Sequence, residues 1–365
     1  MGKTIGYLAA GIVFFFFVVF SVIGYRAFRW YAVLQSSGGP QWSEGVSAVQ
    51  KGWKMEPLAT HDTKTVLVLG VDAIKDRSEG KNNTAILTDS MMVLSYNLKT
   101  NTLTQFSLPR DIWIDAYKTK INALYHYGFD RYPDNPTQFP QEVLQVLLGI
   151  PIHHVVVLKL STVAEIIDSL GGIDVEIDRG FTDELFPRSG VDVATVRDPA
   201  VLYETIQFKK GVEHMSGDRA LKYIRSRHSN DLLEGTDDAR VARQQKVIQA
   251  VMTAVMNRKT LLNPRVIGKL YAVYAREFQQ AIPLEEGVSV LHSLIRSNMQ
   301  TKTLPQPLKL TKYALSIREQ EKPGVLYHPF NRQGSTTYGN QWVYLPIDPS
   351  WKGVQSEVRG FYAKE

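Results

Sequence analysis

The chain has 365 residues, 42 of them Lys or Arg and 36 Asp or Glu, which gives a net charge of +6. About 300 residues lie beyond the amino-terminal segments, enough for one large α/β domain or for one domain with an appendage. The positive charge favours anionic partners such as lipid headgroups, phosphoglycans or a pyrophosphate, and we expect no nucleic acid among them. The absence of cysteine excludes a disulfide framework and a lipoprotein anchor.

Residues 5–24, IGYLAAGIVFFFFVVFSVIG, are uncharged and almost wholly apolar. As a helix they match the roughly 30 Å hydrocarbon core of a bilayer. A cleaved signal peptide is the alternative, but the run exceeds the usual length of about 7–15 residues and no small-residue cleavage site follows. We therefore expect residues 1–33 to form a cytoplasmic stub and a transmembrane signal anchor. Lys3 precedes the run and Arg26 and Arg29 follow it, so the positive-inside rule alone leans against an exported domain.

Residues 34–64 are expected to form a linker, because Ser36-Ser-Gly-Gly-Pro40 is typical of a stalk. From Thr65 onward strand-like and helix-like patterns alternate. Predicted strands cover residues 65–71, 91–96, 103–108, 154–160 and 173–177, and predicted helices cover residues 141–148, 161–170 and 237–258. Ser216 and Asp237 are the expected N-caps of two helices. The alternation predicts an α/β fold, an α/β/α sandwich with a central mixed sheet, preceded by one transmembrane helix.

Asp72 ends the first predicted strand and Asp89 opens the next. If the two carboxylates converge, they form a hard oxygen site of the kind that Mg²⁺ takes beside phosphate oxygens. The alternative is that Asp72 is a turn residue and Asp89 a loop cap. Arg110 and Asp111 follow the second strand of a predicted hairpin, and Lys120 lies in the loop after them. These residues add a guanidinium, a carboxylate and an ammonium at strand ends.

The stretch Tyr223-Ile-Arg-Ser-Arg-His228 is followed by Asp238-Ala-Arg-Val-Ala-Arg-Gln-Gln245. Arg225 and Arg227 are two residues apart and point the same way on an extended segment, whereas Arg240, Arg243 and Gln244 share one face of a helix. Guanidinium forks suit phosphate oxygens, so the pattern predicts a multiply charged phosphate ligand. The alternative is that these arginines are solvated, or paired with Glu234, Asp237 and Asp238.

In this order, over roughly residues 65–256, the motifs resemble the LytR-CpsA-Psr family. The resemblance rests on Val66-Leu-Val-Leu-Gly-Val-Asp72, Thr88-Asp-Ser-Met-Met92, Ser107-Leu-Pro-Arg-Asp111, Lys120-Ile-Asn122, Gly171-Gly-Ile-Asp-Val175, Tyr223-Ile-Arg-Ser-Arg227 and Arg240-x-x-Arg-Gln-Gln245. Family members are membrane-anchored bacterial enzymes that transfer glycopolymers from an undecaprenyl-pyrophosphate carrier to peptidoglycan. The resemblance implies a magnesium-dependent phosphotransferase, of the polyisoprenyl-teichoic acid–peptidoglycan transferase type, outside the cell membrane. It also implies a site whose magnesium ligands are Asp72 and Asp89, and whose pyrophosphate-binding residues are Arg110, Arg225, Arg227, Arg240 and Gln244.

Lys120 and Arg243 are further candidates for the pyrophosphate, and Arg110, Asp111, Arg225 and Arg227 for the catalytic group. One position departs from the family pattern: an arginine usually stands two residues before the aspartate of the Thr88-Asp-Ser90 block, where this chain has Leu87. Arg77 or Lys81 could supply that charge. No counterpart is identified beyond about residue 260, so residues 65–260 are expected to form the catalytic domain and residues 261–365 an extension without assigned function.

Breaking a phosphoester bond requires that the negative charge developing on the oxygens be stabilised, and arginines and Mg²⁺ can stabilise it. No catalytic serine or cysteine motif is present. His126 and His228 lie near the motifs, and Asp111 is a candidate base for the acceptor hydroxyl. The lipid tail requires an apolar tunnel, which a sheet–helix interface could provide. A membrane-attached pyrophosphate hydrolase that uses water remains open, as do a lipid-binding module and a non-enzymatic regulator, although only four residues precede the span.

Overall fold

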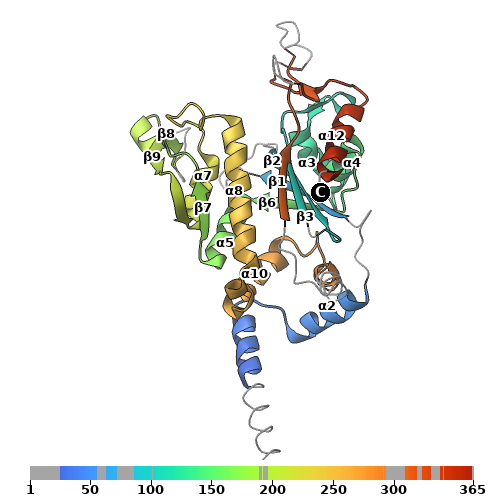
Figure 1. The fold of residues 1–365 in the computed structure, drawn as a ribbon, viewed down its shortest axis with the longest axis vertical. Coiled ribbons are helices and arrows are strands. Elements are labelled where there is room, and N and C mark those ends of the chain that lie inside the picture. The colour runs from blue at the N-terminus through green and yellow to red at the C-terminus, as the bar shows by residue number, and fades with distance from the viewer. Residues whose placement is uncertain are drawn as a thin grey trace, which may run out of the picture. The chain divides into compact units, whose positions relative to one another are not determined.

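The computed structural model describes residues 25–55, 63–71, 86–100, 102–188, 191, 196–290, 292, 309–318, 323–329, 338–339 and 341–363. These residues form two compact units, each built from two stretches of the chain (Figure 1). Unit 1 comprises the described parts of residues 1–46 together with Ala164–Glu277, and unit 2 those of Ser47–Val163 together with Phe278–Glu365. The division differs from the boundaries expected at residues 64 and 260, because segments distant in sequence pack together.

The predicted transmembrane run, residues 5–24, lies outside the described residues. Among the helices that the structure describes, none combines the length and the apolar character needed to cross a bilayer. Residues 25–36 are helical, and α2 (Trp42–Lys54) follows, so part of the predicted linker is folded. A side chain at Gly52 of α2 would collide with the backbone carbonyl of Glu285. This close packing, which local composition does not reveal, holds the end of α2 against the chain around Glu285 within unit 2.

Unit 2 is built around a five-stranded sheet with the order β11-β3-β2-β1-β6. Its strands are β1 (Thr63–Val71), β2 (Thr88–Asn97), β3 (Thr102–Leu108), β6 (His154–Lys159) and β11 (Lys309–Ala314). The pairs β1/β2 and β2/β3 are antiparallel, whereas β6 runs parallel to β1 and β11 parallel to β3. In the predicted hairpin, Asn97 Oδ1 accepts the backbone N–H of Lys99 at 2.9 Å. The α/β fold with a central mixed sheet is confirmed.

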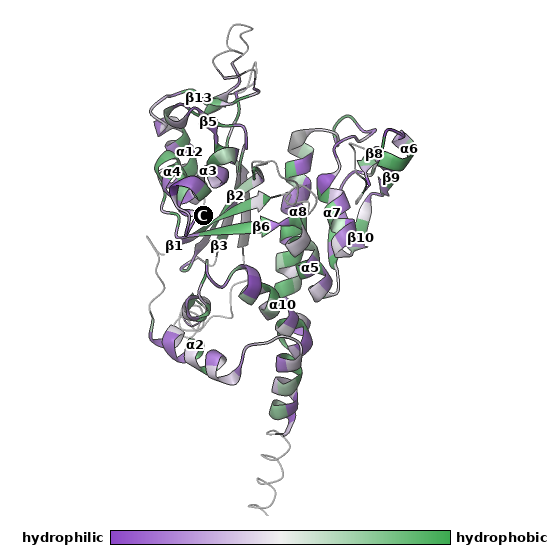
Figure 2. Ribbon diagram, turned by 180° about the vertical axis from the view of Figure 1, so that it is seen from behind, coloured by the Kyte–Doolittle hydropathy of each residue, from purple (hydrophilic) through white to green (hydrophobic). Residues whose placement is uncertain are grey.

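One face of the sheet carries the core of unit 2. Leu67 and Leu69 of β1, Val93 of β2 and Phe106 of β3 are fully buried there. Leu67 and Leu69 lie on the same face because side chains two positions apart on a strand point the same way. The helices that pack on this face are α3 (Leu124–Arg131), α4 (Gln138–Leu148) and α12 (Lys352–Ala363). Phe361 of α12 lies 5.4 Å from Phe106 between ring centroids. The strands β2 and β6 are coloured green, as hydrophobic, in Figure 2.

Short elements surround this core. They are β4 (Trp113–Ile114), η2 (Asp115–Tyr117), β5 (Thr119–Lys120), η3 (Ile121–Ala123), β12 (Leu326–Tyr327) and β13 (Leu345–Pro346). The buried carboxylate of Glu286 ties the chain beyond residue 278 to the sheet, because it contacts Lys64 Nζ and lies 3.0 Å from His154 Nε2. Burial raises the pKa of Glu286, but the hydrogen bonds from Lys64 and His154 outweigh it and lower the pKa below its usual value. With β11, α12 and Glu286, the expected extension supplies part of the central unit.

Unit 1 continues from α5 (Leu160–Leu170). Its further elements are β7 (Ile173–Ile177), β8 (Phe181–Pro187), α6 (Pro199–Leu202), β9 (Tyr203–Phe208), β10 (Gly211–Met215), α7 (Gly217–Arg225), α8 (Asp237–Met256), α9 (Arg258–Leu261) and α10 (Pro264–Glu277). β7 pairs with β10 and β8 with β9, both antiparallel. Ser216 caps α7 as predicted. For α8 the cap is Thr236, not Asp237: Thr236 Oγ1 accepts the N–H of Ala239 at 3.2 Å.

Candidate functional site

In unit 2, four of the predicted site residues form a row of alternating charge, Asp89, Arg110, Asp111 and Lys120. Arg110 Nη1 lies 2.7 Å from Asp89 Oδ1, and its Nε lies 3.6 Å from Asp111 Oδ2. Lys120 Nζ contacts Asp111 Oδ1 at 2.6 Å. We call this group the Asp89 row. Its side chains are between 15% and 45% exposed, so they can meet a ligand from solvent.

Strand pairing explains why these residues meet. The hairpin register pairs Met91 with Leu108, and Asp89 and Arg110 lie two residues beyond this pair on either strand. The pairing of Trp113 with Lys120 in the β4/β5 ribbon then folds Lys120 back beside Asp111. Beneath the row, the buried Thr88 hydroxyl donates to the backbone carbonyl of Asn122 at 3.1 Å. This contact fixes the end of β2.

The predicted magnesium pair is only half described, because Asp72 lies outside the described residues, as do Arg77 and Lys81. Leu87, which stands in place of the family arginine, is 42% exposed. No cluster of three or more acidic or histidine side chains that could enclose a metal ion occurs among the described residues. Mg²⁺ normally keeps several waters and is held by one or two carboxylates together with substrate phosphates. An accessible carboxylate such as Asp89 fits that type of site.

In unit 1, the buried carboxylate of Asp183 holds the segment that carries Arg225 and Arg227. Asp183 Oδ2 accepts the hydroxyl of Ser226 at 2.6 Å and the backbone N–H groups of Arg227 and His228, each at 3.1 Å. Its Oδ1 accepts the N–H of Leu185 at 3.0 Å. We call residues 225–236 the arginine loop. With its backbone fixed from below, the loop leaves Arg227 exposed and Arg225 half-buried.

Asp183 was not among the residues singled out from the sequence. A signal did exist, because β8 alternates and Asp183 falls on the same inward face as Phe181. A charged residue on the buried face of a strand requires partners, since an unpaired buried charge is very costly. Its partners are the backbone and a hydroxyl of the arginine loop, and only the tertiary structure brings them together.

Arg243 differs from the prediction that it binds pyrophosphate, because it is almost completely buried and each of its three side-chain nitrogens donates a hydrogen bond to the protein. Its Nε donates to Tyr223 O at 3.0 Å and its Nη2 to Ser226 O at 2.7 Å. Its Nη1 donates to the carbonyl and the carboxylate of Glu234, at 2.9 and 2.8 Å. Arg243 therefore ties α8 to both ends of the arginine loop and acts as a structural residue. Arg240 and Gln244, its neighbours on α8, remain half-buried.

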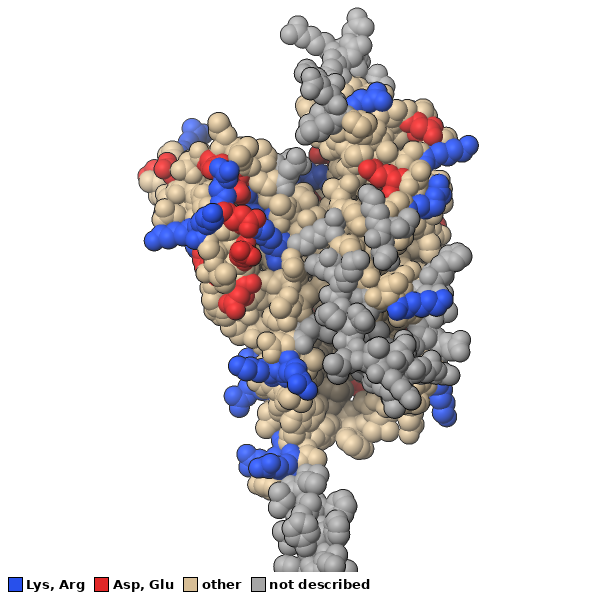
Figure 3. Space-filling view, viewed as in Figure 1, with Lys and Arg blue, Asp and Glu red and all other residues tan. Residues whose placement is uncertain are grey.

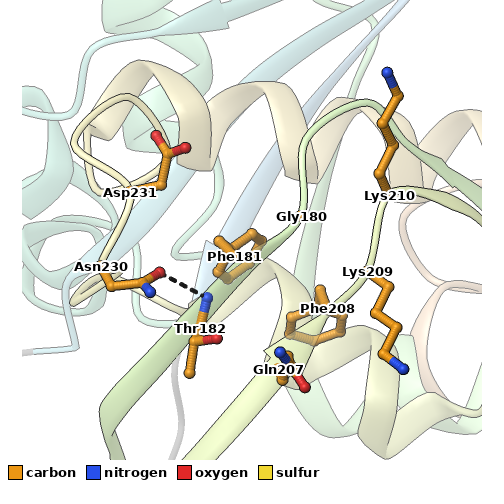
Figure 4. Close-up of a pocket in the computed structure, with 9 residues that line it drawn as sticks. All are labelled: Gly180, Phe181, Thr182, Gln207, Phe208, Lys209, Lys210, Asn230 and Asp231. Atoms are coloured by element: carbon orange, nitrogen blue, oxygen red, sulfur yellow. Dashed lines mark hydrogen bonds between the residues drawn. The ribbon is translucent and has the colours of Figure 1, made fainter.

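Unit 1 also contains a pocket of about 460 Å³ beside the arginine loop, which none of the predicted site residues lines. The rings of Phe181 and Phe208 form its centre, with Asn230 on one side and Lys209 and Lys210 on the other (Figure 4). Asn230 Oδ1 accepts the N–H of Thr182 at 2.9 Å, which fixes the wall formed by the loop. The pocket is open and polar at its rim.

The remaining candidates fall in both units. His126 lies on α3 in unit 2 and is half-buried, whereas His228 lies in the arginine loop and is exposed. Within the described part of unit 2, His126 forms no hydrogen bond or ion pair with Asp89, Arg110 or Asp111. Burial raises the pKa of Tyr223 to about 12, so its hydroxyl stays protonated near neutral pH.

Known proteins share sequence and fold with this chain. Residues 38–343 match the model of the LytR_cpsA_psr family. A curated relative, the polyisoprenyl-teichoic acid–peptidoglycan teichoic acid transferase TagU of Bacillus anthracis, is 26% identical over 201 residues, 54% of each chain. This chain thus spans about half the length of that relative.

Among solved structures, TagV of B. subtilis superposes with a TM-score of 0.53 at 20% identity, over 84% of this chain and 99% of that chain. Protein gbs0355 of Streptococcus agalactiae gives a TM-score of 0.51 at 19% identity, over 83% of this chain and 89% of that one. At these identities the two structures show that the fold is shared.

Proposed function

The chain belongs to the LytR-CpsA-Psr family, and from this premise we propose that it is a phosphotransferase that moves a glycopolymer from an undecaprenyl-pyrophosphate carrier to peptidoglycan. The B. anthracis relative is named as a transferase of teichoic acid to peptidoglycan. The carrier, the polymer and the acceptor of this chain are part of the proposal.

The arginine loop is the observation that carries the proposal. Arg225 and Arg227 are presented two residues apart on a backbone that Asp183 and Arg243 hold from below. A buried scaffold of this kind is needed where guanidinium groups must meet phosphate oxygens in a defined geometry, because a preorganised donor costs little reorganisation during the reaction. Arg240 and Gln244, on the first turns of α8, add donors from the same unit.

The reaction itself makes one bond and breaks one. The acceptor hydroxyl attacks the phosphorus that carries the sugar, the bridging P–O bond of the pyrophosphate breaks, and the carrier leaves as undecaprenyl phosphate. A phosphodiester then links the glycopolymer to peptidoglycan. Negative charge develops on the phosphate oxygens and on the leaving oxygen, and the arginines stabilise that charge. The hydroxyl proton goes to the carboxylate of Asp111, whose 2.6 Å ion pair with Lys120 must first open.

Within unit 2, the Asp89 row offers groups of both signs to a phosphate ligand. Arg110 pairs with Asp89 and Lys120 with Asp111, and we propose that both cations turn to the pyrophosphate when it binds. Mg²⁺, when bound, would be held by Asp89 and Asp72 and would neutralise phosphate charge. Half-buried apolar side chains on the sheet face opposite the core of unit 2, such as Val66, Leu94 and Leu158, suit the prenyl chain.

A product analysis tests the proposal and separates it from hydrolysis. The full-length protein in detergent is incubated with lipid-linked glycan, Mg²⁺ and peptidoglycan, and the products are identified by mass. We expect peptidoglycan that carries the glycopolymer through a phosphodiester. Glycan phosphate released in equal amount with or without peptidoglycan would establish the hydrolase, and intact donor would leave a binding or regulatory protein.

We also propose that residues 5–24 anchor the chain and that the domain lies outside the cell membrane. The uncharged apolar run and the family support this topology. Protease treatment of intact cells tests it: the domain should be digested without lysis. A domain that survives in intact cells and is digested only after lysis would contradict this topology.

A further inference from the structure

Two segments of unit 1 that are far apart in the sequence lie side by side at its surface. One is the helix over residues 25–36, and the other contains α9 and the start of α10. Trp30 Nε1 of the first donates a hydrogen bond to the backbone carbonyl of Leu262 in the second, at 3.1 Å. We call residues 25–30 and 258–269 the collar.

The collar exposes large apolar side chains to solvent. Leu262 is 73% exposed and Phe28 is 68% exposed, and Tyr25, Trp30 and Leu261 are also exposed. Single apolar residues at a surface are ordinary, but a contiguous group of aromatic and leucine side chains marks a surface that meets a partner. Trp and Tyr are characteristic of the interface between membrane and water.

The collar is also basic. Its exposed cations are Arg26, Arg29, Arg258, Lys259, Arg265 and Lys269, and neither residues 25–36 nor residues 257–270 contain an Asp or Glu. Within the described part of the chain, no ion pair is formed by any of the six. Figure 3 shows basic side chains without acidic ones around the first helix and around α9. By contrast, the surface of unit 1 higher in that view carries both signs. Elsewhere in unit 1, basic side chains are paired, as Arg219 Nε is with Glu213 Oε1 at 2.6 Å.

We propose that the collar docks onto the headgroups of an anionic lipid bilayer. The inference rests on the proposed anchor and goes beyond the proposed transfer reaction. The apolar run ends at Gly24, directly before the collar begins. At a helical rise of about 1.5 Å per residue, Trp30 lies only about 7.5 Å beyond Tyr25, and the headgroup layer on each side of a bilayer is roughly 5–8 Å thick. The Trp30 hydrogen bond therefore brings Leu262 and the cations of α9 to the level of the headgroups.

Docking would have a consequence for the enzyme. A single helix leaves a domain able to tilt over the membrane, whereas a second contact at the collar restricts that tilt. Because the proposed donor is itself a membrane lipid, a fixed height and orientation of unit 1 would present the arginine loop at a constant distance from the donor pyrophosphate.

Single cysteines test the docking cleanly, since the natural sequence contains none. Leu262→Cys and, as a matched control, Val212→Cys on β10, which is 72% exposed, are each labelled with the fluorophore NBD in the full-length protein. The protein is placed in nanodiscs of phosphatidylcholine with or without phosphatidylglycerol. We expect a blue shift for the label at residue 262 with the anionic lipid and none at residue 212. Equal, water-like emission at both positions would overturn the proposal.

A charge variant identifies the source of the attraction. A cation near an anionic membrane surface contributes about 1 kcal/mol, roughly fivefold in the binding equilibrium. Arg258→Ser/Lys259→Ser should therefore lower the ratio of docked to undocked label about 25-fold. Lys209→Ser/Lys210→Ser, which removes two adjacent exposed cations from another surface of unit 1, should leave the ratio unchanged.

The other outcomes are equally decisive. The same blue shift with a soluble anionic glycopolymer and no bilayer would overturn membrane docking and make the collar a glycan-binding surface. Loss of the chain from washed nanodiscs would overturn the proposal at the anchor on which it rests. Turnover of lipid-linked glycan in detergent is measured separately, so failure of the proposed function is recognised independently of the collar.

Discussion

Replacement of Asp183 by alanine is expected to release the arginine loop from unit 1. The carboxylate is completely buried and accepts four hydrogen bonds, from Ser226 Oγ and from the backbone N–H groups of Leu185, Arg227 and His228. A buried donor left without an acceptor costs about 1–3 kcal/mol. Water can enter beside the exposed residues of the loop and satisfy some of these donors, so their costs do not add in full. We therefore expect a loss of about 3–5 kcal/mol of unfolding free energy, the range for breaking a buried charged network.

The matched control is Asp231→Ala in the same loop. Asp231 also accepts several hydrogen bonds, from Arg179 and from the N–H groups of Leu233 and Glu234, but its side chain is 25% exposed. Water can replace its contacts, so its loss should cost clearly less unfolding free energy than the loss of Asp183. Urea unfolding of the full-length protein, followed by circular dichroism, measures both changes.

Activity provides a second measurement. In the folded fraction of Asp183→Ala, displaced guanidinium groups should lower turnover by roughly 10²-fold. Ser226→Ala removes only one of the four hydrogen bonds and should lower the unfolding free energy by only about 1 kcal/mol. The reasoning is refuted if Asp183→Ala and Asp231→Ala have equal stability and equal turnover.

Arg225→Lys and Arg227→Lys should each lower turnover by roughly 10²-fold, because lysine keeps the charge but not the bidentate fork. Near wild-type rates for both variants would refute the assignment of these arginines to the pyrophosphate. Asp89→Ala should abolish stimulation of transfer by Mg²⁺ while the thermal unfolding midpoint stays within a few degrees, and unchanged magnesium dependence would remove Asp89 from the metal site. Burial, aided by the nearby Lys64, lowers the pKa of His153 below its usual 6.5. The neutral ring of His153 therefore contributes fully to the free energy of unfolding above about pH 6.5, and this contribution is lost as the pH falls through the lowered pKa. His153→Gln should remove this pH dependence and flatten the acid side of a plot of the unfolding midpoint against pH.

Much of the architecture could be read from local pattern. Alternating and continuous apolar runs predicted the strands around Leu67 and Val93, because a residue in a strand shows its burial through its neighbours two positions away. The hairpin at Asn97 and the helix end at Gly171, with φ +85°, follow from turn and cap chemistry within a few residues. The family could also be recognised from local sequence, because the order of the charged motifs was sufficient to identify it.

Contacts between distant residues were decided only by the tertiary structure. Helical spacing groups Arg243 with Arg240 on one face, yet Arg243 points inward and donates to the carbonyls of Tyr223 and Ser226. The spacing of polar residues along a helix does not predict which edge of that face is buried. Glu286 and α12 joined a unit whose other half lies more than a hundred residues earlier, because hydrophobic and ionic contacts depend on distance in space. The sequence by itself determined which segments form strands and helices and which chemistry they carry. The tertiary structure decided that Arg243 binds the protein itself, because its role depends on the acceptors that folding brings within hydrogen-bonding distance.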